Sequence, residues 1–384
     1  MSSVLTRARV RVCLCAVRPG ATSLLTELLK AVSRSFYLTM RVLPAKIRPQ
    51  FGLAYLLARA ADTIADTEII PVTQRLEALR DLRERILGTR PQPLDFRELA
   101  RSQGAQRKVL QHCEAAVHDI ELSKIIEPSQ STDASNAERR LLEQIEDVLG
   151  LVSCFAAEDQ QRIREVLTII TGGQELDLRR FASVEIENRN IVALKTDAEL
   201  DDYTYRVAGC VGEFWTKMCR AHVFSHAKLD DDALLRDGVR FGKGLQLVNI
   251  LRDLPRDLQQ GRCYLPIERL TRADLKPKDL LDRSNEARLR PVYDDLLNLA
   301  ESHLAAGWAY TNSLPRSAMR IRLACAWPVL IGVKTLARLR RENPLDAEHR
   351  VKVSRAEVKQ IMVATLLRYP FAASWQQQFE RFKS

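Results

Sequence analysis

Apolar residues recur at helical spacing along most of the chain, whereas the alternation of apolar and polar residues that marks β-strands is hard to find. The clearest helical stretch runs from 242 to 266, where Leu245, Val248 and Leu251 recur at roughly helical spacing. A second stretch of this kind runs from 51 to 66. Leu, Ala, Arg and Glu dominate the composition, and Gly and Pro are sparse, which favours helix. The sequence therefore predicts an all-α protein.

No internal repeat and no linker divides the 384 residues, so we expect one domain over residues 23–384. Stretches rich in polar residues, Gly and Pro predict loops at 88–96, 127–137 and 341–350. The tail, 371–384, is weakly amphipathic. The apolar pattern predicts further helices over 23–37, 74–87, 97–125, 138–150, 158–171, 171–181, 201–218, 288–313, 315–340 and 355–368.

The first 22 residues carry several arginines and no acidic residue. A targeting leader would have this composition, but the stretch has no clear signal-peptide apolar region or cleavage site. We therefore expect residues 1–22 to be a poorly ordered basic N-terminus. The longest apolar stretch, 323–333, is too short to cross a membrane.

The net charge of +10 suits a nucleic acid, an anionic lipid or a polyanionic substrate, although a generally Arg-rich proteome gives the same excess. The arginines are dispersed and no basic run is interleaved with aromatic residues, so we expect no nucleic-acid binding. The eight scattered cysteines form no CxxC or zinc motif and are interpreted as reduced thiols of a cytoplasmic protein. His222 and His226 have a spacing that can bind metal, but without a third ligand we expect a solvated helix end.

Two pairs of aspartates, each four residues apart, lie inside apolar helices. Asp62 and Asp66 belong to FGLAYLLARAADTIAD, and Asp253 and Asp257 belong to QLVNILRDLPRD. One such pair usually marks a solvated face, but carboxylates on two largely buried helices are costly unless a cation lies between them. Mg²⁺ is commonly held by a few carboxylates together with substrate phosphates. We therefore predict that Mg²⁺ ions hold a diphosphate here, and that the two helices face each other across a central cavity.

Polar residues beside the aspartates predict further contacts to a substrate. Arg59 and Arg252 each stand next to one pair, and Gln246 and Asn249 precede Asp253 by two turns and one turn. The amide side chains are expected to add neutral metal ligands or diphosphate contacts.

The cluster SRSF contributes a second group of candidates. Ser33, Arg34 and Ser35 have donors for a phosphate, and Phe36 offers an aromatic wall. The alternative is a helix end with one buried phenylalanine. Tyr55 lies one turn before Arg59 and joins the candidates for substrate binding.

Small residues mark two helices as places of close approach. The stretch 171–181 contains a glycine pair, and 201–218 carries Ala208, Gly209 and Gly212 along one side. Such residues allow either helix packing or the approach of a ligand along a channel. Tyr203 in the second stretch could act on a carbocation through its ring face or its hydroxyl.

Several motifs resemble the squalene and phytoene synthase family, which joins two prenyl diphosphates head to head. Two more segments, LACAWPVLIGVKTLA (323–337) and VKVSRAEVKQIM (351–362), are similar to parts of squalene synthases, and the second resembles their basic flap near NADPH. The resemblance covers roughly residues 30–368 and implies a single-domain helical bundle of the isoprenoid-synthase type. The matching motifs are SRSF (33–36), YLLARAADTIAD (55–66), YxxxVAGxVG (203–212) and QLVNILRDLPRD (246–257).

The resemblance also implies a division of roles. The four aspartates would bind Mg²⁺ ions that hold the diphosphates of two farnesyl diphosphates. Phe36 would help to exclude water from the carbocation. Further contacts to diphosphate would come from Arg59, Arg252, Ser33 and Arg34.

Tyr203 matches the family tyrosine implicated in closing the cyclopropane of presqualene diphosphate, with released diphosphate as the alternative base. Lys352 and Arg355 are expected to hold the 2′-phosphate side of NADPH, whose hydride would complete squalene.

Two departures from the pattern leave the product open. Ala65 and Arg256 stand where eukaryotic squalene synthases usually carry an extra acid, and their C-terminal membrane anchor is missing. Phytoene, dehydrosqualene or hydroxysqualene would follow from the same first half-reaction. A non-catalytic assembly protein on the same helical scaffold is a third hypothesis, although it would have little reason to keep these residues. We expect a monomeric cytoplasmic enzyme without a transmembrane anchor, in peripheral contact with the inner membrane surface.

Overall fold

The computed structural model describes residues 21–32, 40–67, 69–102, 129–182 and 191–383. The predicted substrate residues Ser33, Arg34 and Phe36 lie outside the described residues, as do residues 1–20 and most of the predicted helix over 97–125. The prediction of an all-α protein is confirmed over the described ranges. The longer helices are α1 (Ala21–Val32), α3 (Arg48–Ala65), α4 (Val72–Leu87), α6 (Ser129–Glu143), α8 (Ala157–Arg180), α10 (Cys210–His222), α11 (Asp231–Gln259), α13 (Glu286–Ser313), α14 (Met319–Leu339) and α15 (Arg355–Arg368).

Shorter elements complete the chain. The π-helical turn η3 directly follows α9, and the two-residue strands β1 and β2 pair in parallel. The short elements are α7 (Ile145–Gly150), β1 (Val192–Ala193), α9 (Asp197–Thr204), η3 (Tyr205–Gly209), β2 (Arg262–Cys263), α12 (Ile267–Arg272), α16 (Ala372–Gln376) and α17 (Gln378–Lys383).

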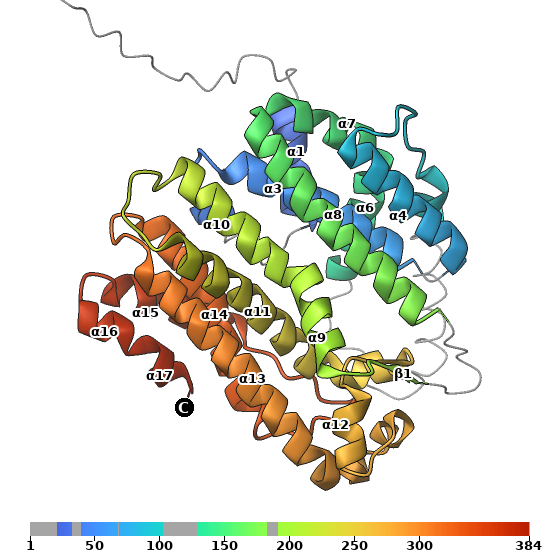
Figure 1. Cartoon of the computed structure of the whole chain (residues 1–384), viewed down its shortest axis with the longest axis vertical. Helices are drawn as coiled ribbons and strands as arrows, with labels where there is room; N and C mark the ends of the chain where they lie inside the picture. The colour runs from blue at the N-terminus through green and yellow to red at the C-terminus, as the bar shows by residue number, and fades with distance from the viewer. Residues whose placement is uncertain (1–20, 33–39, 68, 103–128, 183–190, 384) are drawn as a thin grey trace, which may run out of the picture.

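Two hydrophobic cores lie side by side. The N-terminal helices, blue to green in Figure 1, gather in one half of the molecule, and the C-terminal helices, orange to red, gather in the other. α10 adds Phe214 and Met218 to the first core, whereas α11 adds Leu247 and Leu251 to the second. The two aspartate pairs are therefore carried by different halves, the first by α3 and the second by α11.

Glycines let α10 and its preceding turn pack directly against α11. A Cβ atom on Gly212 would lie 1.9 Å from the carbonyl oxygen of Gly238, and one on Gly242 would lie 2.1 Å from that of Ala208. Any larger residue would push the backbones apart. Gly173 of α8 packs in the same way against the Arg206 side chain. These contacts support packing as the role of the small residues.

The hydroxyl of Tyr293 replaces a backbone hydrogen bond that α11 lacks because of Pro255. Proline has no N–H, so the Leu251 carbonyl loses its partner one turn earlier in the helix. The hydroxyl of the fully buried Tyr293 donates to that carbonyl at 2.9 Å. The buried carbonyl therefore has a partner, and α11 runs on through Pro255 from Asp253 to Asp257.

Several predicted elements differ from the structure: the predicted helices 158–171 and 171–181 form one helix, α8, and η3 divides the predicted helix 201–218. α6 begins at Ser129, inside the predicted loop 127–137, because packing against α1 and α3 overrides the low helix propensity of a Ser- and Asn-rich stretch. α14 begins at Met319 rather than 315. His222 ends α10 and bonds the buried Asp159 at 2.8 Å, so it does not share a helix with His226.

The C-terminal tail is packed rather than free. Trp375 and Phe379 are buried, and the ring of Trp375 stacks on Trp308 of α13 with centroids 5.3 Å apart. The apolar side of this weakly amphipathic stretch therefore faces the second core.

Candidate active site

The first aspartate pair lies at the C-terminal end of α3. Asp62 is in the last turn and Asp66 is the residue that caps it. Burial raises the pKa of Asp62 to about 7, and the charge of Asp66 adds to the effect, although 47% of the Asp62 side-chain surface is exposed. Gln174 of α8 donates a hydrogen bond to Asp62. These two carboxylates repel each other and favour a cation.

Arg59 is held by an acid that the sequence analysis missed. Its guanidinium pairs with Glu138 of α6, and it lies 4.0 Å from Asp62. Tyr55 is one turn away on the same helix, with its hydroxyl 3.5 Å from the Val32 carbonyl. Glu138 lies at the start of the predicted helix 138–150, but no local pattern in the sequence places it beside Arg59.

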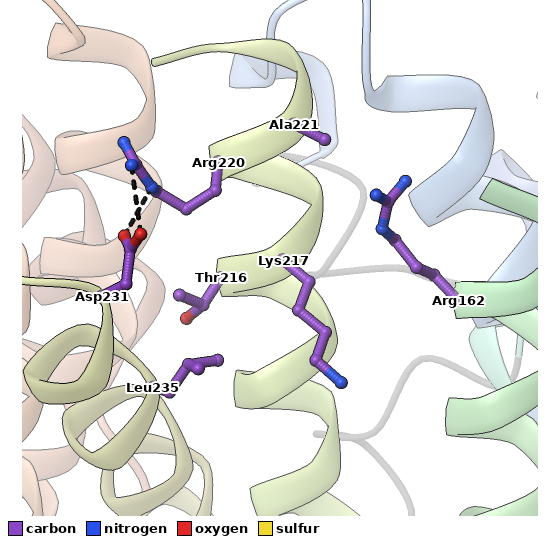
Figure 2. Close-up of a pocket in the computed structure, with 7 residues that line it drawn as sticks. All are labelled: Arg162, Thr216, Lys217, Arg220, Ala221, Asp231 and Leu235. Atoms are coloured by element: carbon purple, nitrogen blue, oxygen red, sulfur yellow. Dashed lines mark hydrogen bonds and ion pairs between the residues drawn. The ribbon is translucent and has the colours of Figure 1, made fainter. Parts of the chain in front are cut away.

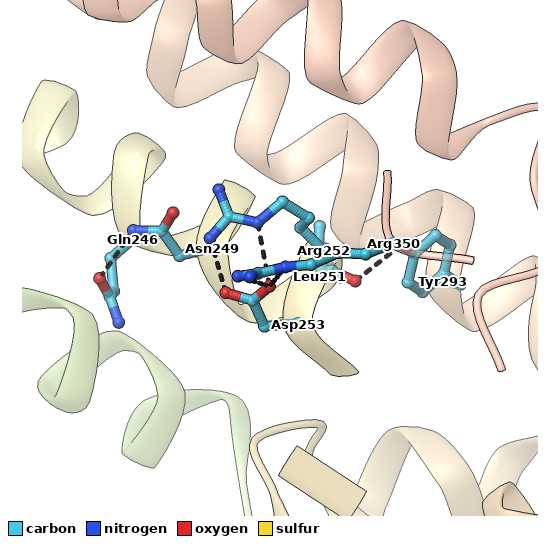
Figure 3. A network of polar contacts seen from close by, with 7 residues as sticks. All are labelled: Gln246, Asn249, Leu251, Arg252, Asp253, Tyr293 and Arg350. Carbon is cyan, nitrogen blue, oxygen red and sulfur yellow. Dashed lines mark hydrogen bonds and ion pairs between the residues drawn. The ribbon is translucent and has the colours of Figure 1, made fainter. Parts of the chain in front are cut away.

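The second pair lies near the C-terminal end of α11. Burial would raise the pKa of Asp253, but hydrogen bonds from Arg252 and Arg350 lower it below its ordinary value. Arg252 bonds it at 3.0 and 2.6 Å, and Arg350 at 3.1 and 2.7 Å. Figure 3 shows both guanidinium groups turned toward this carboxylate. Asp257 has the opposite shift, since burial first and the charge of Asp253 second raise its pKa to about 7.

The two amide side chains precede this pair on α11. Asn249 and Gln246 are 3.5 Å apart and form a short polar row leading to Asp253. Asn249 is exposed and Gln246 is half-buried. Their predicted contacts to metal or diphosphate stay predictions.

Two further residues, Asp177 and Tyr203, lie within electrostatic reach of both pairs. The charge of Asp177, on α8, raises the pKa of Asp257, and the charge of Asp66 raises the pKa of Asp177. The charges of Asp257 and Asp62 raise the pKa of Tyr203. The ring of Tyr203 stacks on that of Tyr264, with centroids 4.6 Å apart. The Tyr264 hydroxyl donates to Asp177 at 2.9 Å. Tyr203 was predicted as a site residue, but Asp177 and Tyr264 were not.

Short backbone pairings fix the positions of the two tyrosines. The amide of Val192 donates to the Gly261 carbonyl at 3.0 Å, and the amide of Leu194 donates to the Cys263 carbonyl at 3.1 Å. These bonds tie the segment that enters α9 to the segment that leaves α11. A π-helical turn, a feature common at functional sites, begins two residues after Tyr203.

The predicted nicotinamide residues lie close to Arg350 in the sequence. Lys352 is exposed, and its carbonyl accepts a hydrogen bond from Arg338. Arg355 is the first residue of α15, whose start is fixed by a capping box between Ser354 and Glu357. Their contact with a cofactor stays a prediction.

The donor set suits magnesium, which prefers carboxylate oxygens. Within the described ranges, no group of three or more His, Cys, Asp or Glu side chains is arranged to hold a metal ion. Each pair by itself therefore offers two carboxylates. Such sites fit a hard cation that completes its shell with water and diphosphate oxygens.

A pocket elsewhere on the molecule has a different character. About 470 Å³ in volume, it lies among α8, α10 and α11 (Figure 2). Its cations already have acidic partners: Arg220 pairs with Asp231 at 2.7 Å, and Lys217 pairs with Glu213 at 2.7 Å. Neither aspartate pair lines this pocket.

Among the described helices, none is long and apolar enough to cross a membrane.

Comparison with known proteins agrees with this architecture. The sequence profile of squalene/phytoene synthase matches residues 29–357. The chain is 26% identical over 315 residues to squalene synthase ERG9 of Saccharomyces cerevisiae, covering 81% of this chain and 60% of that protein. It is 28% identical over 287 residues to presqualene diphosphate synthase of Zymomonas mobilis, covering 74% of each. A solved complex of TcSQS with the ligand BPH1237 superposes with a TM-score of 0.66 at 22% identity, covering 94% of this chain and 90% of that one.

The fold is that of the isoprenoid synthases of the squalene synthase type. The chain belongs to the squalene/phytoene synthase family, whose members are prenyltransferases that condense prenyl diphosphates head to head. It spans about three fifths of the length of the curated yeast relatives that it matches.

Proposed function

We propose that this protein joins two farnesyl diphosphates to presqualene diphosphate and reduces that intermediate to squalene with NADPH. The observation that carries the proposal is that one carboxylate of each pair, Asp62 of α3 and Asp257 of α11, lies within electrostatic reach of the buried Tyr203. The similarity to a squalene synthase over 81% of the chain favours the complete reaction.

The two carboxylate pairs suit the binding of Mg²⁺. When bound, Mg²⁺ would neutralise the diphosphate and so promote ionisation of the allylic substrate. Asp62 and Asp66 would hold the metal at one diphosphate, and Asp253 and Asp257 would hold it at the other. Arg59 and Arg252 would add charge-assisted hydrogen bonds to the diphosphate oxygens.

The chain's own residues would guide the carbocation. The ring of Tyr203 would offer a π face that stabilises positive charge, and its hydroxyl lies within electrostatic reach of Asp177 and Asp257. The apolar residues of the second core exclude water, which would otherwise trap the cation as an alcohol.

Lys352 and Arg355 are the proposed contacts for the 2′-phosphate of NADPH, which would supply hydride in the second half-reaction. The contact between Arg350 and Asp253 supports this assignment, because it holds the preceding loop against the second carboxylate pair.

A second candidate function ends one step earlier. The similarity to presqualene diphosphate synthase over 74% of each chain favours an enzyme that releases presqualene diphosphate. An assay with farnesyl diphosphate and Mg²⁺, with and without NADPH, distinguishes the two. Squalene formed only with NADPH supports the complete reaction. Presqualene diphosphate that NADPH leaves unchanged supports the shorter one, and phytoene from the geranylgeranyl homologue would contradict both.

We also propose that the exposed strip formed by α15 and by Phe371, which follows it, contacts an anionic membrane surface. Val363, Leu366, Leu367 and Phe371 are exposed large apolar residues, 53%, 43%, 70% and 65% accessible. The exposed cation Lys359 lies one turn before Val363. An apolar strip with a basic edge complements anionic lipid, and a bilayer would supply and receive the apolar chains.

A further inference from the structure

Two stacked tyrosines connect the centre of the proposed site to a carboxylate. The ring of Tyr203 stacks on that of Tyr264 with centroids 4.6 Å apart, and the Tyr264 hydroxyl donates to Asp177 Oδ2 at 2.9 Å. Because Tyr264 gives its proton to Asp177, its oxygen keeps lone pairs that can accept a proton from the neighbouring Tyr203. A proton passed along this row would therefore travel in one direction, from Tyr203 to Asp177.

The carboxylate at the end of this row, that of Asp177, can accept a further hydrogen bond or a proton. Its second oxygen, Oδ1, is buried and has no hydrogen-bond partner. Arg262 and Arg180 favour the charged form of Asp177, whereas the charge of Asp66 opposes it. Burial is the largest influence, and it raises the pKa of Asp177 to about 6. The group is thus mostly ionised at neutral pH and accepts a proton at small cost.

Tyr203 alone cannot accept a proton from the substrate. Burial raises its pKa far above the ordinary value of a tyrosine, so the side chain is a neutral phenol at neutral pH. A phenol that gained a proton without losing one would become a buried oxonium cation, which is very unfavourable. A connected acceptor removes this difficulty, because Tyr203 can pass on its own proton as it receives another.

We propose that Tyr203, Tyr264 and Asp177 form a proton relay that ends on Asp177 and accepts the proton released when the condensation closes the cyclopropane. This inference rests on the proposed function. The C–H bond beside the cation breaks, and its electron pair forms the last C–C bond of the ring. The proton binds the Tyr203 oxygen, the Tyr203 proton moves to Tyr264, and the Tyr264 proton moves to Asp177. The net change is one C–C bond and one carboxylic acid. Loss of that proton to water after product release restores the carboxylate.

Tyr264 and Asp177 act through Tyr203, so they are positioning residues that hold and move a proton. The relay is tested by single-turnover formation of presqualene diphosphate without NADPH at saturating Mg²⁺. Asp177→Asn and Tyr264→Phe are each expected to lower the rate by about 100-fold, as general-base loss does, with little change in KM. Asp177→Glu should recover much of the rate, and the double variant should be little worse than either single one.

Tyr205→Phe is the matched control. Tyr205 is also a tyrosine bonded to a carboxylate, Glu213 at 3.1 Å, but it stands outside the relay. This variant should keep the wild-type rate.

Three results would overturn the relay. A rate within about threefold of wild type in Asp177→Asn would assign the proton to another base, such as diphosphate. A loss of Mg²⁺ affinity in calorimetry of that variant would make Asp177 a metal ligand instead. A lower melting temperature with an unchanged rate in Tyr264→Phe would mean a structural tyrosine. If wild-type protein forms no presqualene diphosphate, the proposed function fails along with the relay.

Discussion

Arg350 reaches Asp253 across 97 residues of sequence and donates to its Oδ1 atom from two nitrogens, at 3.1 and 2.7 Å. Arg350 thereby offsets the charge of a proposed metal ligand. It also ties the loop before Lys352 to α11. A metal that binds Asp253 must compete with this arginine, so the contact couples the diphosphate end of the proposed site to its reductant end.

Removing this arginine should strengthen the binding of Mg²⁺ alone. We expect Arg350→Ala to tighten the Mg²⁺ dissociation constant about fivefold in calorimetry, the equivalent of ~1 kcal/mol for a partly exposed ion pair. Hydrogen exchange over residues 341–354 should become faster. Arg283→Ala, which removes the partner of Asp346 in the same loop, should speed exchange without changing the Mg²⁺ affinity. Weaker Mg²⁺ binding in Arg350→Ala would contradict the competition.

Neutralising one aspartate of either pair should abolish turnover without unfolding the protein. Asp62→Asn or Asp253→Asn is expected to lower kcat by about 1000-fold or more, because several kcal/mol of charge stabilisation at the diphosphate is lost. Asp295→Asn, on the exposed side of α13, is the control. Near-normal activity in either site variant would rule out the assignment of its pair to metal binding.

The metal-free protein should become less stable as the pH rises from 6 to 8. Asp62 and Asp257 each have a pKa of about 7 in the folded protein, against 3.8 as the ordinary value. The folded state therefore holds more protons than the unfolded state, and the stability this confers is lost as pH rises through 7. Thermal melts at the two pH values measure the effect. The double variant Asp62→Asn/Asp257→Asn should show a smaller change in melting temperature between them. Saturating Mg²⁺ should also remove it. A wild-type melting temperature that rises over this range would contradict the argument.

Tyr293→Phe tests the hydrogen bond from the Tyr293 hydroxyl to the Leu251 carbonyl of α11. The change leaves the Leu251 carbonyl buried and without a partner, which should cost about 1–3 kcal/mol of unfolding free energy in urea titrations. Pro255→Ala supplies a backbone N–H to the same carbonyl, so in that background Tyr293→Phe should cost much less. Equal costs in the two backgrounds would mean that the hydroxyl and Pro255 are unrelated.

The exposed strip on α15 makes a prediction about membranes. Leu367→Glu with Phe371→Glu should abolish flotation of the protein with vesicles of anionic lipid, because burial of the apolar side chains drives the contact. The control, Leu87→Glu with Leu281→Glu, changes the charge equally at two other exposed leucines and should float normally. Flotation that survives the α15 change would exclude this surface.

The sequence predicted the helices and both aspartate pairs because their signals are local. Periodicity identified α15 to the residue, and the spacing of Asp253 and Asp257 was enough to mark the second pair. Asp177 and Tyr264 were missed although both lie in stretches that attracted attention, since no local pattern shows that two segments 87 residues apart share a hydrogen bond. Arg350 was missed for the same reason. Glu138 was missed for this reason too, although it lies in a stretch predicted to be helical, because its ion pair with Arg59 joins distant parts of the chain.

The central claim is that the two carboxylate pairs serve one head-to-head condensation. The most direct test incubates the protein with farnesyl diphosphate and Mg²⁺ without NADPH, followed by phosphatase treatment and mass spectrometry. The account predicts the alcohol of presqualene diphosphate from the wild-type chain, and none from Asp62→Asn or from Asp253→Asn. Farnesol as the sole product of wild type, or the same product from either variant, would contradict it.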